Sequence, residues 1–202
     1  MRVSRQQAAA NRERVLDTAG ELFRLRGLDG VTIADIMKAA GLTHGGFYLQ
    51  FASKEALAEE ACARGVRESV AALYESAVGP PDTPADGGSR HDALRRVVDD
   101  YLSVHRREDP HDACTVAALA ADAWRGSPQM QEVFASGVTG MALAMGSVTG
   151  DPPAEGVPAA PDFPALATMI GAMVLSRAVH GSDPALSDRI LEETRQRLID
   201  GD

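Results

Sequence analysis

The chain has 202 residues, of which 45% are hydrophobic and 24% charged, as in a globular protein of one or two domains. Alanine-rich, periodic segments with few β-branched runs predict helices throughout. The net charge of −9 argues against a uniformly basic nucleic-acid binder, but residues 1–64 carry nine Lys and Arg against eight Asp and Glu. The remaining residues carry eleven against twenty-one, so only the N-terminal end is suited to meeting phosphates.

The cysteines and the apolar runs indicate which cofactors and which cellular compartment to expect. Cys62 and Cys114 form no Cys-x-x-Cys motif and have no His at zinc-ligand spacing, so we predict free thiols, no metal and no cofactor. The N-terminal residues lack the apolar segment of a signal peptide, and the longest apolar run, residues 165–175, is shorter than the about 20 residues that cross a bilayer. We therefore expect a cytoplasmic protein outside the membrane.

The N-terminal 30 residues predict an arm and a helix. Residues 1–10 are expected to form a loose basic arm, in which Arg2 and Arg5 either reach DNA or are simply solvated. A helix with one apolar stripe is expected from about Ala8 or Asn11, and Gly27 ends it.

Residues 31–51 predict two short helices joined by a tight turn. Thr32 is suited to capping the first helix, and Asp35 stands three residues later, where a carboxylate can bond the free N–H groups. Gly41 supplies the freedom that the turn needs, and Thr43 can cap the second helix. This is the order of a helix-turn-helix unit, whose second helix can lie in a DNA major groove, although an ordinary helical corner fits the same turn chemistry.

The order of residues favours the DNA-binding interpretation. The pattern G-L-T-x-G-x-F-Y-x-x-F-x-S-K-E-x-L, from Gly41 to Leu57, resembles the DNA-binding domain of the TetR family of transcriptional repressors, and the match extends back to about Asn11. The resemblance implies an all-α fold of about nine helices. It implies a three-helix DNA-binding domain with its arm at residues 1–57 and a helical effector-binding and dimerisation domain at residues 58–202.

The resemblance also implies which residues contact DNA. Thr32, Tyr48 and Lys54 match phosphate-contacting positions of the family, and Thr43, His44 and Gly45 stand at the start of its recognition helix. His44 and the pair Leu49–Gln50 depart from the commoner residues, which affects base preference rather than the mode of binding. A symmetric dimer would place two recognition helices about 34 Å apart on a palindromic operator.

Beyond this domain the sequence predicts six helices and two loops. The helices cover about 53–77, 91–107, 112–125, 128–145, 162–180 and 184–200, with caps at Ser53 and Ser127. The loops, residues 79–90 and 146–161, are rich in proline. The helix over 53–77 would link the DNA-binding domain to the body.

Seven side chains of the body are candidates for lining an effector cavity, which the resemblance implies there: Tyr101, His105, Cys114, Trp124, Met130, Phe134 and Met141. For each of them plain core packing is the alternative. Tyr101 and His105 are expected on the buried face of one helix. Cys114, beside His111 and Asp112, is either an inert buried thiol or a thiol that senses oxidants or electrophiles. Cys62 is interpreted as structural.

The last two helices predict an oligomer. Residues 163–175 are almost all apolar or small, and a helix without a polar side needs partners on more than one face. We expect these helices to pair with their copies in a four-helix bundle, as in the TetR family, with a monomer core helix as the alternative. The expected interface residues are Phe163, Leu166, Ile170, Val174, Leu186 and Ile190.

Together these features predict a homodimeric repressor that a small hydrophobic effector releases from DNA. An enzyme is not expected, because the sequence shows no Gly-rich phosphate loop, no nucleophile elbow and no spaced acid–base pair. The alternatives are a thiol-based redox or electrophile sensor acting through Cys114 and a helical interaction module that does not bind DNA.

Overall fold

The computed structural model describes residues 4–78, 89–109, 113–150, 157 and 159–201. Within these residues the chain forms nine α-helices, one 3-10 helix and no strand, which confirms the all-α prediction. The elements are α1 (Arg5–Arg26), α2 (Ile33–Ala39), η1 (His44–Leu49), α3 (Lys54–Val78), α4 (Arg90–Tyr101), α5 (Val104–Glu108), α6 (Thr115–Ala123), α7 (Pro128–Thr149), α8 (Phe163–His180) and α9 (Pro184–Asp200). Outside the described residues lie Arg2, His111 and Asp112, residues 79–88 of the first expected loop, and residues 151–156 and 158 of the second.

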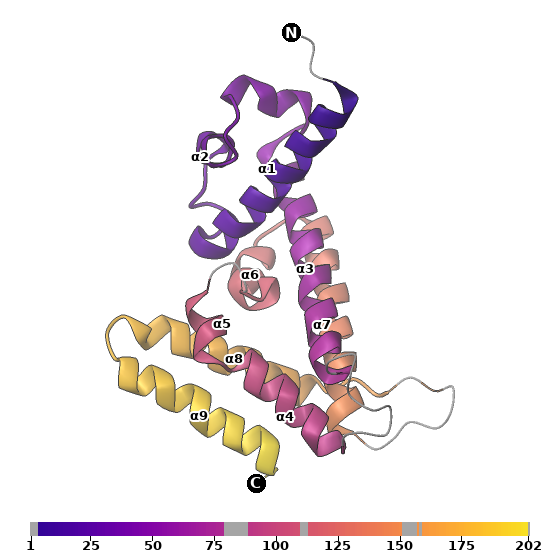
Figure 1. Ribbon diagram of the computed structural model, residues 1–202, viewed down its shortest axis with the longest axis vertical. Coiled ribbons are helices and arrows are strands. Elements are labelled where there is room, and N and C mark those ends of the chain that lie inside the picture. Colours follow the sequence, from indigo (N-terminus) through magenta and orange to yellow (C-terminus); the bar gives the residue numbers. More distant parts are fainter. Residues whose placement is uncertain (1–3, 79–88, 110–112, 151–156, 158, 202) are drawn as a thin grey trace.

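The helices form an elongated molecule with the two termini at opposite ends (Figure 1). α1 and α2 lie at the N-terminal end, and α4, α8 and α9 lie at the other end. α3 and α7 run side by side between them, and α6 packs against both α1 and α7. Gly137 allows the close approach of α7 to α3, because a Cβ there would overlap the side chain of Val66. One continuous hydrophobic core connects the two ends.

Local capping explains where several helices begin. The Ser53 hydroxyl accepts a hydrogen bond from the Ala56 N–H at the start of α3 (3.1 Å). Ser127 caps α7 by accepting from the Met130 N–H (3.1 Å), with Pro128 in the first turn. Both caps were expected from the sequence, because each hydroxyl lies immediately before an apolar helical pattern.

Two expectations for the N-terminal region were wrong. α1 begins at Arg5, before Ala8, because the Ser4 hydroxyl accepts from the Gln7 N–H (3.1 Å) and caps it. The expected arm is therefore largely helix, including Arg5. Thr43 precedes η1 but makes no side-chain capping bond, and the second helix of the unit is a single short 3-10 helix.

The helix expected over residues 91–107 is in fact two helices. α4 ends at Tyr101, and Ser103 starts α5 by accepting a hydrogen bond from the Arg106 N–H (3.1 Å). A serine that bonds the backbone ahead of it favours a new helix start over continuation of the old helix. Because of this break, His105 does not share the buried face of Tyr101; its side chain is 75% exposed.

α7 extends to Thr149, into the loop expected at residues 146–161. Gly146 has room only for hydrogen, because a Cβ there would overlap the backbone of Ala160. The Asp162 N–H donates to the Ala142 carbonyl (2.8 Å) and the Thr149 hydroxyl donates to the Asp162 carboxylate (2.6 Å). These contacts hold the end of α7 against the segment that leads into α8.

α3 belongs to both parts of the molecule. Leu57 and Ala61 are buried in its N-terminal half, and Val66 and Leu73 are buried further along. The domain boundary expected between residues 57 and 58 would therefore fall inside one continuous helix, and it stays a prediction.

Candidate nucleic-acid interface and effector site

The helix-turn-helix unit begins with a reciprocal cap between Thr32 and Asp35. The Thr32 hydroxyl accepts from the Asp35 N–H (3.2 Å), and the Asp35 carboxylate accepts from the Thr32 hydroxyl (2.6 Å) and N–H (3.0 Å). The hydrogen bond from the Thr32 hydroxyl, and then the bond from its N–H, lower the pKa of Asp35 below its ordinary value. The cap thus fixes the start of α2, and Thr32 itself is exposed.

The turn between α2 and η1 depends on Gly41. Its φ of 68° lies in the left-handed region, which glycine adopts without strain. The Gly41 N–H donates to the Lys38 carbonyl (3.1 Å), and the Leu42 N–H donates to the Met37 carbonyl (2.8 Å). These bonds end α2 and direct the chain into η1.

Aromatic side chains fix η1 on the domain. Phe47 and Phe51 are buried, and their ring centroids lie 5.6 Å apart. Tyr48 stands edge-on to Phe47 (5.1 Å) and to His44 (6.4 Å), and 63% of its side chain is exposed. The inner rings anchor the element while Tyr48 and His44 face outward.

Leu49 and Gln50 have different environments. Leu49 is 88% exposed, whereas Gln50 is partly buried and its side-chain oxygen is buried without a hydrogen-bond partner. Of the two residues that depart from the commoner pair, only Leu49 projects outward.

Part of the N-terminal positive charge is neutralised within the chain. Arg12 donates to both carboxylate oxygens of Glu60 (2.6 and 2.5 Å), and its hydrogen bond lowers the pKa of Glu60. Arg64 pairs with Glu13 and with Asp17 (2.5 Å). These pairs fasten α1 to α3, so the charge count of the sequence overstates how much positive charge is free for phosphates.

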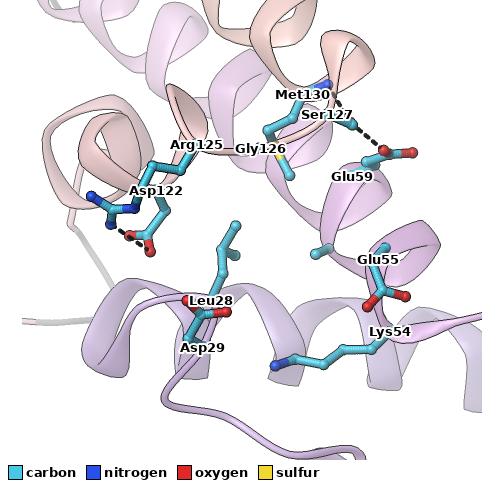
Figure 2. A pocket seen from close by; sticks show the side chains of 11 residues that line it. Leu28, Asp29, Lys54, Glu55, Glu59, Asp122, Arg125, Gly126, Ser127 and Met130 are labelled. Carbon is cyan, nitrogen blue, oxygen red and sulfur yellow. Dashed lines mark hydrogen bonds and ion pairs between the residues drawn. The ribbon is translucent and has the colours of Figure 1, made fainter.

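Lys54 differs from these arginines, because no ion pair of its side chain is found in the part of the chain that the structure describes. It is the first residue of α3 and is partly exposed. Its ammonium group extends along the edge of a cavity toward Asp29 (Figure 2). The five other expected DNA contacts, Thr32, Thr43, His44, Gly45 and Tyr48, are all exposed on α2 or η1 or just before them.

Comparisons with known proteins agree with this geometry. The family model described as bacterial regulatory proteins of the tetR family matches residues 15–61. The chain is 45% identical over 51 residues to the uncharacterised HTH-type transcriptional regulator YvdT of Bacillus subtilis. The aligned stretch is 25% of this chain and 26% of that protein. It is 34% identical over 80 residues to the HTH-type transcriptional repressor KstR2 of Mycobacterium tuberculosis, which is 40% of each.

Residues 15–61 of the chain therefore form a DNA-binding domain of the TetR family. The aligned stretches span only about a quarter to two fifths of the length of these relatives. The fold of the whole chain is similar to that of reduced Escherichia coli NemR (TM-score 0.69, 20% identity, 94% of this chain and 95% of that chain). A TetR-family regulator from Agrobacterium tumefaciens gives a TM-score of 0.71 at 18% identity, with 94% and 98% covered.

In the body of the chain, two of the seven effector candidates share a groove between α6 and α7. Trp124, 72% exposed, and Phe134 line a groove of about 650 Å³. The other lining residues are Val116, Ala120, Ala123, Gln131, Ala135 and Val138. Gln131 is the one polar side chain among them, so the groove is suited to an apolar molecule.

Met130 lines a different cavity, of about 200 Å³, where the DNA-binding end meets the body. Figure 2 shows its charged rim, with Asp29, Lys54 and Glu55 facing the ion pair of Arg125 and Asp122 (3.7 Å). Ser127 closes one side by donating to Glu59 (2.6 Å).

Three further candidates, Tyr101, Cys114 and Met141, are packed in the core. The Tyr101 hydroxyl is buried without a hydrogen-bond partner; burial, and then the neighbouring Cys114 thiol, raise the pKa of Tyr101 well above its ordinary value. The seven residues are therefore not gathered in one pocket. Their role in binding stays a prediction.

Both cysteines are free and buried. Burial raises the pKa of Cys62 to about 12, so its thiolate is scarce near neutral pH, as expected of a structural cysteine. Cys114 lies just before α6 and lines a small pocket of about 120 Å³ beside Arg106. Its redox role stays a prediction. Within the described residues no three His, Cys, Asp or Glu side chains are grouped to hold a metal.

The structure also has a groove of about 710 Å³ between α3 and α7, which the sequence did not predict. Val66, Val70 and Val133 line it together with Gly137 and Gly140 of α7. The two glycines three residues apart were the available signal, since small residues allow helices to approach closely. The partner helix, however, is more than 60 residues away in the sequence.

α8 and α9 leave apolar surface uncovered. Phe163, Val174 and Leu186 are 47%, 42% and 37% exposed, Ile170 and Ile190 are partly buried, and Leu166 is in the core. By length and composition α8 could cross a membrane, but core helices of soluble proteins pass the same test. Only 28% of this stretch is buried within the protomer, so most of an apolar helix is available to a partner.

Proposed function

We propose that this TetR-family protein is a transcriptional repressor that binds operator DNA as a homodimer and dissociates when a small apolar effector binds its body. The observation that carries DNA binding is η1, which presents His44, Tyr48 and Leu49 outward while Phe47 is buried beneath them. The name of KstR2 as a transcriptional repressor supports this function for the matched domain. The protein would act in the cytoplasm on double-stranded DNA.

The reading geometry follows from a two-fold axis along the α8–α9 surface. Two copies of η1 would enter successive major grooves about 34 Å apart and read a palindrome. Thr32, Tyr48 and Lys54 would hold the phosphates, and Thr43, His44 and Gly45 would approach the bases, because all but Lys54 are exposed and Lys54 makes no ion pair among the described residues.

Lys54→Ala and Tyr48→Ala are expected to weaken binding to DNA taken from upstream of the protein's own gene. Lys54→Ala removes one charged phosphate contact per subunit, so the slope of log affinity against log salt should become shallower by about 1 per subunit. Tyr48→Ala removes an uncharged contact and should weaken binding with little change in slope. Fluorescence anisotropy at several salt concentrations measures both.

Arg95→Ala is the matched control, because Arg95 is an exposed cation on α4, at the opposite end of the molecule. It should leave both affinity and slope unchanged. If Lys54→Ala and Arg95→Ala gave the same slope, Lys54 would not contact a phosphate, and if both Lys54→Ala and Tyr48→Ala bound like the wild type, η1 would not be the reading element.

For the effector we propose the groove between α6 and α7. Its apolar lining and the exposed indole of Trp124 support binding of a small hydrophobic, planar compound. α6 also contacts α1, where the Asp122 carboxylate lies beside Gly27. A ligand that prefers one position of α6 would thereby shift the DNA-binding end, since coupling needs only different affinities for the two states.

Val138→Arg is expected to abolish effector binding. Val138 lines the α6–α7 groove, and an arginine would both fill the groove and charge it. Trp124 is the only tryptophan of the chain, so its fluorescence reports directly on occupation by a panel of small aromatic compounds. The wild type should show a blue-shifted Trp124 emission and release of DNA; Val138→Arg should show neither.

Val133→Arg is the control. Val133 is also partly buried on α7, but it lines the groove on the α3 side. It should keep the wild-type fluorescence response. The opposite result, loss of response only in Val133→Arg, would place the effector between α3 and α7.

A further inference from the structure

We infer that Leu49 reads the C5-methyl group of a thymine in the major groove, an inference that rests on the proposed DNA binding. Leu49 is the most exposed large hydrophobic side chain among the described residues, at 88%. It is the last residue of η1 and directly follows Tyr48, an expected phosphate contact. Contact with an apolar group outside the chain would remove this side chain from water, which is favourable.

Leu49 is the apolar side chain that η1 presents outward, because its neighbours are either buried or polar. Gln50 has its side-chain oxygen buried, so its amide is not freely presented to base edges. Phe47 and Phe51 are held in the core. The rings of Tyr48 and His44 stand edge-on to one another, with 6.4 Å between their centroids.

Gly45 supports a close approach at the same surface. A Cβ at Gly45 would meet no atom within 4 Å, and its φ is not in the positive region. Neither packing nor backbone conformation within the chain therefore requires glycine there. A bare backbone four residues before Leu49 allows η1 to lie closer to the floor of a groove.

Chemistry identifies what Leu49 would recognise. A leucine side chain forms no hydrogen bond, so it cannot discriminate among the donor and acceptor groups of the bases. The one apolar group that an unmodified base pair presents in the major groove is the thymine methyl. Each half-site of the operator should accordingly contain a thymine whose methyl group affects affinity.

Replacing that thymine by deoxyuridine is expected to weaken binding by about four-fold per half-site, the effect of one buried methyl-sized group. The duplex is first enriched from random double-stranded DNA with the full wild-type chain. Each thymine is then replaced singly, and dissociation constants are measured at fixed salt. Leu49→Ala should bind the thymine and deoxyuridine duplexes equally, whereas Leu49→Met, which keeps an apolar tip, should retain a preference for thymine.

Leu25→Ala is the matched control, since Leu25 is an exposed leucine (54%) of the same domain on α1. It should keep the four-fold preference, and all three variants should have the melting temperature of the wild type. The role of Leu49 is overturned if Leu49→Ala still prefers thymine, or if no thymine of an enriched duplex affects affinity when it is replaced. Either result leaves the proposed repressor function standing. Failure to enrich any duplex overturns the proposed function and this inference with it.

Discussion

Val174→Arg is expected to convert the proposed homodimer into a folded monomer. Val174 lies on the uncovered side of α8, 42% exposed, in a stretch from Phe163 to Ser176 without a charged residue. In a two-fold interface the substitution places two unpaired cations in an apolar contact. We expect the dimer dissociation constant to rise by roughly a thousandfold or more, since each unpaired charge costs a few kcal/mol.

Sedimentation equilibrium measures this change, with circular dichroism to show that the helices remain. Because a monomer can bind only one half-site, affinity for the palindromic operator should fall with it. Leu25→Arg introduces the same charge at an exposed leucine of α1, outside α8 and α9, and should remain dimeric. A dimeric Val174→Arg would show that the α8–α9 surface is not the subunit interface.

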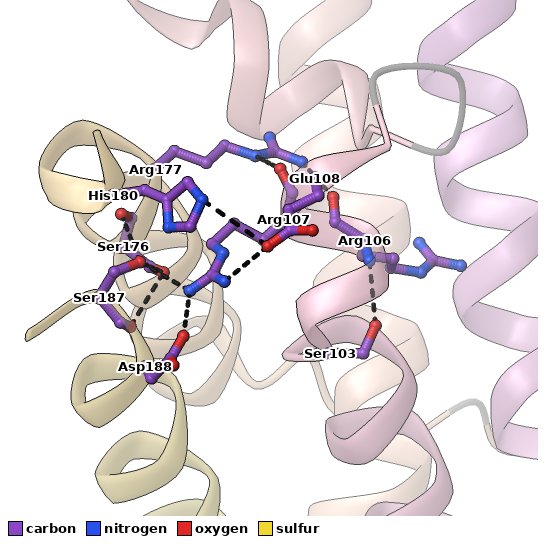
Figure 3. A network of polar contacts seen from close by, with 9 residues as sticks. All are labelled: Ser103, Arg106, Arg107, Glu108, Ser176, Arg177, His180, Ser187 and Asp188. Atoms are coloured by element: carbon purple, nitrogen blue, oxygen red, sulfur yellow. Dashed lines mark hydrogen bonds and ion pairs between the residues drawn. The ribbon is translucent and has the colours of Figure 1, made fainter. Parts of the chain in front are cut away.

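Arg107→Ala is expected to destabilise the protomer by roughly 2–3 kcal/mol. The Arg107 side chain is only 4% exposed and joins α5 to α9 (Figure 3). Its guanidinium donates to the Ser187 hydroxyl (2.8 Å), to Asp188 (2.6 Å) and to Glu108 (2.9 Å). The loss is smaller than for a fully buried pair, because both carboxylates are half-exposed and can regain water.

Thermal unfolding should show this as a fall of about 4–12 °C in melting temperature. Arg189→Ala removes an arginine from the exposed pair with Glu193 on α9, where both side chains are about 70% exposed, and should change stability by less than about 0.5 kcal/mol. Equal effects of the two substitutions would mean that burial of Arg107 adds nothing to its ion pairs.

The network around Arg107 also shows how α5 is held to α8. Arg177 of α8 donates to the backbone carbonyls of Arg106 (2.7 Å) and Arg107 (3.3 Å). Ser176 and Ser187, both fully buried, hydrogen-bond to one another between α8 and α9 (2.7 Å). The hydroxyls of Ser176 and Ser187 thus satisfy each other between the two helices. The sequence patterns of α8 and α9 did not predict this pairing.

The starts of several helices could be predicted from signals that lie within four residues of one another in the sequence. Three helices start where the sequence predicts them: α2 at Thr32 and Asp35, α3 at Ser53, and α7 at Ser127 and Pro128. These starts are predictable because a cap needs only its own side chain and the next turn of backbone. The same short range explains the errors. Ser4 and Ser103 are equally good caps, yet apolar periodicity alone favoured a later start for α1 and one continuous helix over residues 91–107.

By itself the sequence determined the helical class, the helix-turn-helix unit and the apolar character of α8, since each depends on residue types at fixed local spacing. Only the tertiary structure decided which charges stay free. Arg12 and Arg64 are neutralised by carboxylates about 50 residues away, whereas Lys54 forms no ion pair with the residues that the structure describes. Leu49 projects outward, and the side-chain oxygen of Gln50 is buried. The tertiary structure also places three effector candidates apart: Trp124 in the α6–α7 groove, Met130 in the cavity beside Lys54, and Tyr101 in the core. Such outcomes depend on which helix faces pack together, and periodicity along one helix does not identify its partner.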